Sequence, residues 1–258
     1  MRKHKFAVLA ALAVLAAGAY AQSTQKKAEV AKAAAPAADA ATEAEVKRII
    51  EPRLGDGVKV DSVRLTPYSG LYEVRTNGDI IYTDRKGEFL FVGNILNSKT
   101  YENYTKARVD EINKIKFSDL PLDLAMKVVK GDGKRVMAIF EDPNCGYCKR
   151  FRQTTLKEID NVTIYTFLYN ILSEDSSVKS KNIWCSPDKV KALDDWMIEN
   201  KQPPAAPANC ANPNEKVAEL GRKLRINGTP AIFFADGSRI PGAIDARMLE
   251  QKLSSIKQ

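Results

Sequence analysis

The sequence contains little histidine and little cysteine, and after its first residues it has no apolar run long enough to cross a bilayer. One histidine, His4, and four cysteines occur in 258 residues. Basic residues outnumber acidic ones by 40 to 32, but the two kinds alternate along the chain and form no basic stripe. A nucleic-acid partner is therefore not implied. A hydrophobic content of 44% is enough for one large domain or two modest ones.

The start of the chain predicts a cleavable secretory signal peptide over residues 1–21. Three basic residues precede an unbroken apolar run at residues 6–15 (FAVLAALAVL), and residues 19–21 (AYA) form a small-x-small cleavage site. The alternative is an uncleaved membrane anchor, but the apolar stretch is short for a span. Cleavage would leave 37 basic and 32 acidic residues and would remove His4. Nucleophiles and metal sites that need histidine are then excluded.

The next part of the chain predicts a tether, a small domain and a connecting helix. Residues 22–43 are alanine-rich and low in complexity, which favours a flexible tether. Residues 44–100 combine a short amphipathic helix with four strand-like segments, and Asn77-Gly78 between two of them is a strong hairpin signal. So small a unit would gain stability by dimerising. Residues 101–120 are charged with sparse apolar positions, as in a linker helix between domains.

The last part, residues 121–258, predicts an α/β domain. Its strands are expected at residues 134–140, 162–168 and 231–235, and its helices at residues 145–159, between 174 and 200, at 214–224 and at 245–256. This alternation of strands and helices, closed by a hairpin and a terminal helix, is a coherent α/β order.

The segment EDPNCGYCKRF places Cys145 and Cys148 at the predicted start of a helix. Unpaired backbone amides and the helix dipole stabilise an anion there, which favours the thiolate of the first cysteine. Three nearby basic residues were expected to add positive charge: Lys149, Arg150 and Arg152. Such a pair can cycle between dithiol and disulfide, because the second thiol can release a mixed disulfide formed by the first. Gly146 and Tyr147, between the cysteines, leave room for a polypeptide to approach.

Two other roles for the cysteine pair are disfavoured. A structural zinc site usually needs four ligands in close pairs, but Cys185 and Cys210 are 25 positions apart and histidine is missing, so no metal is predicted. A purely structural Cys145–Cys148 link would close too short a loop to stabilise much. In an exported chain the even cysteine count favours a structural disulfide between Cys185 and Cys210. A second redox centre is the alternative for that pair.

The CGYC motif after a strand, Thr229-Pro230 before another strand, and the terminal helix resemble the thioredoxin fold. Residues 183–185 (IWC) and 209–210 (NC) are similar to the second cysteine pair of the bacterial periplasmic DsbC/DsbG family of disulfide isomerases. Residues 74–95 (VRTNGDIIYTDRKGEFLFVGNI) resemble the dimerisation domain of that family. The resemblance covers roughly residues 44–258.

This resemblance implies a cystatin-like helix-plus-meander dimerisation domain, a linker helix and a thioredoxin-fold catalytic domain with a helical insertion. It implies a periplasmic homodimer, V-shaped, that acts on misfolded or mis-oxidised exported proteins without a metal or organic cofactor. The membrane reductant DsbD would restore its dithiol. The catalytic residues would be Cys145 and Cys148. The substrate-binding residues would be Gly146, Tyr147, Thr229 and Pro230, with Pro230 in the cis form and the Thr229 backbone beside Cys145, free to pair with a substrate strand.

One position departs from the pattern of thioredoxins and DsbA-type oxidases. They carry a buried acid six residues before the first cysteine, where this chain has Ile139. Glu141 and Asp142 lie nearer the motif and are expected to point elsewhere. Disulfide isomerisation is the leading function. The alternatives are a DsbG-like reductase of sulfenylated cysteines and a holdase chaperone, whereas a DsbA-type oxidase would lack the meander unit.

Overall fold

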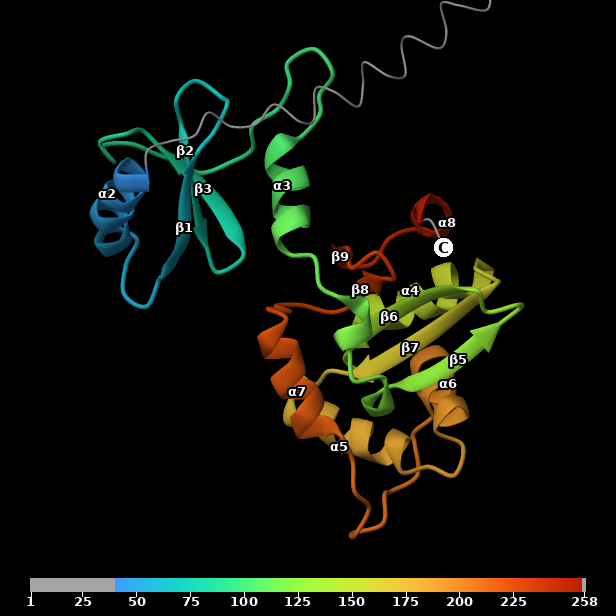
Figure 1. Cartoon of the computed structure of the whole chain (residues 1–258). Helices are drawn as coiled ribbons and strands as arrows, with labels where there is room; N and C mark the ends of the chain where they lie inside the picture. Colours follow the sequence, from blue (N-terminus) through green and yellow to red (C-terminus); the bar gives the residue numbers. More distant parts are fainter. Residues whose placement is uncertain (1–39, 257–258) are drawn as a thin grey trace, which may run out of the picture. The chain divides into compact units, whose positions relative to one another are not determined.

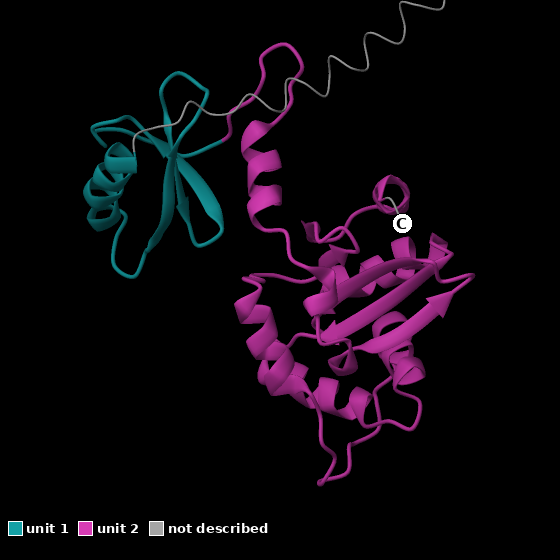
Figure 2. Ribbon diagram, in the orientation of Figure 1, with its two compact units in different colours: residues 1–93 teal, residues 94–258 magenta. Residues whose placement is uncertain are grey.

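The computed structural model describes residues 40–256, so the predicted signal peptide, His4 and most of the predicted tether lie outside the described residues. The chain divides into two compact units between Gly93 and Asn94 (Figure 2). The segment predicted as a linker belongs to the second unit. Within residues 40–256, no helix has both the length and the apolar character that a membrane span needs.

The first unit is one helix packed on a four-stranded antiparallel meander (Figure 1). Its elements are α2 (Ala40–Ile50), the short 3-10 helix η2 (Glu51–Arg53), β1 (Val60–Leu65), β2 (Tyr72–Thr76), β3 (Asp79–Thr83) and β4 (Leu90–Phe91), with the strands in sequence order. Val46 and Ile50 of the helix pack against buried valines of β1 and β2. Asn77 and Gly78 both have positive φ, 48° and 90°, as the predicted tight hairpin requires.

The helix of this unit begins at Ala40, four residues before its predicted start at residue 44. Glu43, in its first turn, accepts a hydrogen bond from the backbone amide of Leu65 at 3.2 Å, which ties the helix to the end of β1. Alanine has the highest helix propensity of all residues. Low complexity therefore concealed the beginning of this helix.

The second unit is a five-stranded mixed sheet with helices on its faces (Figure 1). Its order is β5-β7-β6-β8-β9, with β6 and β7 parallel and the other pairs antiparallel. The strands are β5 (Met126–Lys130), β6 (Arg135–Glu141), β7 (Val162–Leu168), β8 (Ala231–Phe234) and β9 (Arg239–Pro241). The helices are α3 (Tyr104–Ile112), η3 (Phe117–Asp119), η4 (Leu122–Leu124), α4 (Gly146–Phe151), the π-helix η5 (Arg152–Leu156), α5 (Glu174–Trp184), α6 (Lys189–Glu199), α7 (Asn214–Lys223) and α8 (Ala246–Ser255).

Side chains of the central strand β6 alternate between two cores. Met137 and Ile139 pack with Leu249 of α8, whereas Ala138 and Phe140 pack on the opposite face in the cluster that α7 completes. The alternation follows from the two-residue period of a strand. Ile139 is fully buried among apolar side chains, so an ionised acid at this position would lie in the apolar core beneath α8. The loop that leads to Cys145 therefore starts at the end of the central strand of the sheet, β6.

Candidate active site

Two distant segments meet at the cysteine pair. Cys145 is the N-cap of α4, and its Sγ accepts a hydrogen bond from the Cys148 amide at 3.2 Å. The same sulfur lies 3.3 Å from the backbone carbonyl oxygen of Thr229, 84 positions further along the chain. The Thr229–Pro230 bond is cis, as expected. The structure therefore brings the motif and the Thr-Pro loop together around one sulfur atom.

The pKa values of the two thiols are shifted in opposite directions. The pKa of Cys145 is lowered to about 6, chiefly by the hydrogen bond from the Cys148 side chain, with burial opposing it and contacts from Thr229 and backbone amides helping. The pKa of Cys148 is raised, first by burial, then by its hydrogen bond with Cys145 and by the negative charge of Glu141. At neutral pH the first cysteine is therefore mainly a thiolate, and the second keeps its proton.

The side chains between the cysteines are accessible. Tyr147 is 70% exposed. A Cβ added at Gly146 would meet no other atom within 4 Å, so the surface over the first turn of α4 is open. Cys145 itself is only 5% exposed. The sulfur is thus almost covered, whereas the side chain of Tyr147 beside it is open to solvent.

Two of the three basic residues predicted to act on Cys145, Lys149 and Arg152, make their contacts with other groups. The ammonium group of Lys149 lies 3.9 Å from the centre of the Trp196 ring and donates a hydrogen bond to Asn200. Arg152 is buried and pairs with Glu141 and Asp194. The low pKa of Cys145 comes mainly from hydrogen bonds at the helix start. Sequence proximity indicated the right helix but the wrong source of stabilisation.

Asp142, which the sequence did not connect with the site, fixes the loop before Cys145. It is fully buried, and its Oδ2 accepts hydrogen bonds from the amides of Ile171 and Leu172 at 2.9 and 3.0 Å. Its Oδ1 accepts from the amide of Asn144 at 2.8 Å and from the hydroxyl of Ser176 at 2.7 Å. The loop is thus bound to the start of α5.

Trp196 of α6 holds the same loop from another helix. Its indole Nε1 donates a 2.6 Å hydrogen bond to the carbonyl of Pro143. Cys145 and Cys148 pack in one buried cluster with Trp196 and other apolar residues of α5 and α6. The helical insertion, formed by α5, α6 and the proline-rich segment that leads to α7, therefore forms one wall of the cysteine site. The Asp142-Pro143 dipeptide, which favours a turn, was the sequence signal that could have suggested a fixed loop here.

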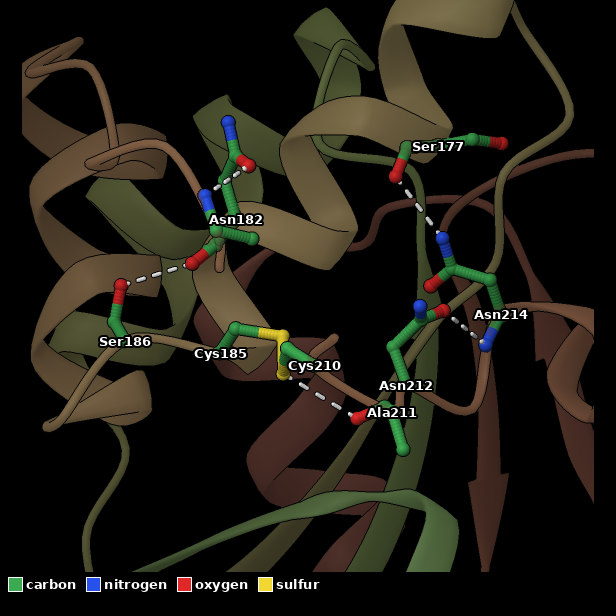
Figure 3. Close-up of a disulfide and its surroundings, with 9 residues drawn as sticks. Ser177, Asn182, Cys185, Ser186, Cys210, Ala211, Asn212 and Asn214 are labelled. Carbon is green, nitrogen blue, oxygen red and sulfur yellow. Dashed lines mark hydrogen bonds between the residues drawn. A yellow bond between two sulfur atoms is a disulfide. The ribbon is translucent and has the colours of Figure 1, made fainter. Parts of the chain in front are cut away.

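A disulfide between Cys185 and Cys210 closes the helical insertion (Figure 3). Cys185 is the C-cap of α5, and Cys210 lies in the proline-rich segment that leads to α7. Asn182 accepts a hydrogen bond from the amide of Ala206 at 2.9 Å, and Asn214 donates to the carbonyl of Ser177 at 2.9 Å. The pair is a structural link in a wall of the site, whereas Cys145 and Cys148 carry free thiols.

Metal-ligating side chains do not gather elsewhere in the described part of the chain. Within residues 40–256 there is no group of three or more His, Cys, Asp or Glu side chains placed to hold an ion. The two free thiols of Cys145 and Cys148 are therefore the reactive groups on which the site is built.

We predict that Cys148→Ala raises the pKa of Cys145 and that Cys148→Ser largely preserves it. Serine retains a side-chain donor for the Cys145 sulfur, alanine does not, and both keep the backbone amide. The measurement is the rate of Cys145 alkylation by iodoacetamide against pH. In the wild type it should fall as pH drops through about 6. Equal midpoints for the alanine and serine variants would contradict this assignment.

We also predict that the double variant Cys185→Ala/Cys210→Ala is less stable by roughly 3.5 kcal/mol, the chain-entropy value for a loop of this size. The free energy of unfolding in urea measures the effect, with Cys145 and Cys148 blocked by alkylation in both proteins. The matched control is the wild type with the same block and no reductant. An unchanged unfolding midpoint would show that the hydrogen bonds of Asn182 and Asn214 hold the insertion without the disulfide.

Sequence comparison places both units in known families. Residues 33–106 match the family described as "Disulfide bond isomerase protein N-terminal domain". Residues 122–257 match the family described as "Thioredoxin-like domain". The two matches correspond to the helix-plus-meander unit and to the mixed sheet that carries the cysteine pair.

Individual relatives agree. A probable thiol:disulfide interchange protein DsbC of Bordetella parapertussis is 48% identical over 198 residues, covering 77% of this chain and 70% of that protein. DsbC of Escherichia coli K12 is 31% identical over 191 residues, covering 72% and 78% respectively. The crystal structure of a disulfide interchange protein from Neisseria gonorrhoeae superimposes with a TM-score of 0.51 at 35% identity, over 54% of this chain and 99% of that one. With its paired thiols in a thioredoxin-like domain behind an isomerase-type N-terminal domain, the chain belongs to the DsbC family of thiol:disulfide interchange proteins.

Proposed function

We propose that this protein rearranges incorrect disulfides in exported proteins. The observation that carries the proposal is the opposed protonation of the two thiols, with a thiolate at Cys145 and a buried, protonated Cys148. A nucleophile that is active at neutral pH starts the exchange readily. A resolving thiol that is hard to ionise leaves the mixed disulfide time to rearrange.

The exchange conserves disulfide bonds. The Cys145 thiolate attacks one sulfur of a substrate disulfide, forms a mixed disulfide and frees a substrate thiolate. When that thiolate attacks another sulfur of the substrate, the rearranged chain leaves and Cys145 is restored. When it does not, Cys148 loses its proton and attacks Cys145, which releases a reduced substrate and leaves an oxidised enzyme. A reductant in the membrane, DsbD, is the proposed source of the electrons that restore the dithiol.

The substrate contacts proposed for this step lie around the sulfur. Tyr147 offers an exposed ring, Gly146 leaves the first turn of α4 open, and the backbone of Thr229 beside cis-Pro230 can pair with an extended segment. Leu172, 56% exposed and bound through its amide to the Cys145 loop, adds apolar surface. Such contacts suit unfolded segments in general, because backbone pairing does not depend on sequence.

Action in the periplasm is part of the proposal. The Cys185–Cys210 disulfide supports it, because such links persist in oxidising compartments. The signal-like start of the sequence, outside the described residues, has the composition of an export signal.

A homodimer joined through the first units is proposed as the working form. Strand β4 is a two-residue edge strand, and the residues in and around it are apolar and exposed: Phe89 at 63%, Leu90 at 45%, Phe91 at 47% and Val92 at 82%. An exposed apolar sheet edge is a site for pairing with another chain. A second copy of this unit would cover it by extending the meander.

We expect the full chain, kept reduced, to restore activity to a scrambled ribonuclease with several disulfides, and Cys145→Ser to abolish this recovery. Cys148→Ala should retain part of it, because rearrangement through the mixed disulfide needs only the first sulfur, but should accumulate trapped substrate. Recovered ribonuclease activity and the mixed disulfides seen on non-reducing gels are the measurements. Recovery that survives Cys145→Ser would remove the mechanism.

For the dimer, we expect sedimentation equilibrium to give twice the chain mass for the wild type and a single chain mass for Phe91→Asp. The buried charge would be unpaired in an interface that includes β4. Val129→Asp is the matched control, since Val129 is a comparably exposed apolar residue (54%) on strand β5 of the other unit. A dimer in all three proteins would place the interface elsewhere.

A further inference from the structure

A buried carboxylate beside the cysteine pair has one oxygen without a partner. Glu141 ends strand β6 and is fully buried. Its Oε2 accepts two hydrogen bonds from the Arg152 guanidinium, at 2.9 and 2.7 Å. Its Oε1 is buried and accepts none. Because a buried acceptor without a donor loses its hydration without compensation, such an atom in a folded protein calls for an explanation.

The surroundings of Glu141 connect it with the resolving cysteine. Arg152 follows Cys148 by four residues, so the two side chains lie on the same face of the helix. The negative charge of Glu141 raises the pKa of Cys148. The charges of Glu141 and Cys148 both favour the charged form of Arg152 and raise its pKa. Glu141 thus lies near enough to the motif for its charge to act on Cys148, which the sequence did not predict.

The rest of the cluster holds the guanidinium in place. Arg152 donates to Asp194 of α6 at 3.0 Å and to the hydroxyl of Thr166 in β7 at 2.9 Å. The charged and titratable groups around Glu141 are thus Arg152 from η5, Asp194 from α6 and the thiol of Cys148. Arg152 is anchored on several sides and does not need Oε1 for its own hydrogen bonds.

We propose that Glu141 accepts the proton of Cys148 through Oε1, directly or through one water molecule, when Cys148 releases the mixed disulfide. This inference rests on the thiol chemistry of the proposed function and names the group that enables its release step. The Cys148 S–H bond breaks and an O–H bond forms on Glu141. The Cys148 thiolate then attacks the Cys145 sulfur, the Cys145–Cys148 disulfide forms, and the substrate sulfur leaves with the electron pair of the bond that breaks.

The electrostatics favour this transfer. Burial raises the pKa of Glu141 although Arg152 opposes the rise, so its carboxylate is a stronger base than a glutamate on the surface. Once the proton has moved, Glu141 is neutral and no longer opposes the thiolate. The negative charge passes from one neighbour of Arg152 to another, so the number of buried charges does not change. Ionising Cys148 without an acceptor would instead add a second buried anion.

The test is a stopped-flow reaction of the reduced full chain with dithiobis(nitrobenzoate), an aromatic disulfide whose thiol product absorbs visible light. Attack by Cys145 liberates the first thionitrobenzoate, and attack by Cys148 on the resulting mixed disulfide liberates the second. We expect Glu141→Gln to leave the first phase unchanged and to slow the second on the order of 100-fold, within the range for loss of a general base.

The pH profile separates proton transfer from a merely structural role. In the wild type the second phase should accelerate as pH rises through the raised pKa of Glu141 and then level off, because only the ionised carboxylate accepts a proton. In Glu141→Gln that inflection should vanish, and the rate should rise only at alkaline pH, where Cys148 ionises to solvent. An inflection retained in the variant would overturn the proposal.

Asp194→Asn is the matched control. It removes another carboxylate from the same guanidinium, but one whose side chain is 46% exposed, so both phases should stay near the wild-type rates. Because Glu141→Gln leaves the buried Arg152 short of a counter-charge, a second variant, Glu141→Gln/Arg152→Gln, removes both charges and should show the same slow second phase.

A second phase at the wild-type rate in a folded Glu141→Gln or double variant would overturn the proposal. A faster one would do so as well, because it would show that the carboxylate only repels the thiolate. No protein substrate enters this measurement. Failure to rescue a scrambled protein with both phases intact would therefore count against the proposed function and leave the role of Glu141 standing.

Discussion

The chemistry of this protein depends on the hydrogen bonds that the Cys145 sulfur receives from its own helix. The backbone amide and the side chain of Cys148 both point to that sulfur, and they stabilise it as an anion even though burial opposes the charge. The same contact keeps the proton on Cys148. One interaction therefore sets both protonation states, a thiolate at Cys145 and a thiol at Cys148, because the two-residue spacing places both groups in the first turn of one helix.

The position of the Cys145 sulfur depends on the loop before it, and hydrogen bonds to the helical insertion fix this loop. Asp142 accepts hydrogen bonds from the amides of Ile171 and Leu172, just before α5, and Trp196 of α6 donates one to the carbonyl of Pro143. The insertion is in turn closed by Cys185–Cys210. A change far from the motif in sequence can thus alter the geometry at the reactive sulfur, because the wall of the site and its loop are one hydrogen-bonded unit.

Much of this could be predicted from the sequence, and the failures have physical causes. The hairpin at Asn77-Gly78 and strand β7 followed from local signals, since turn chemistry and apolar runs act over a few residues. Strand β5 was missed because it is a short edge strand whose alternating burial resembles that of a polar segment. The position of Glu141 near the motif was not predicted because its partner, Arg152, comes from another element, and tertiary pairing of charges leaves no local pattern.

The presence of Cys185–Cys210 gives this chain a folding problem of its own. Four cysteines can pair completely in three ways, and only one of them contains the Cys185–Cys210 disulfide of this structure. Each newly made copy is thus itself a molecule whose bonds can be joined wrongly.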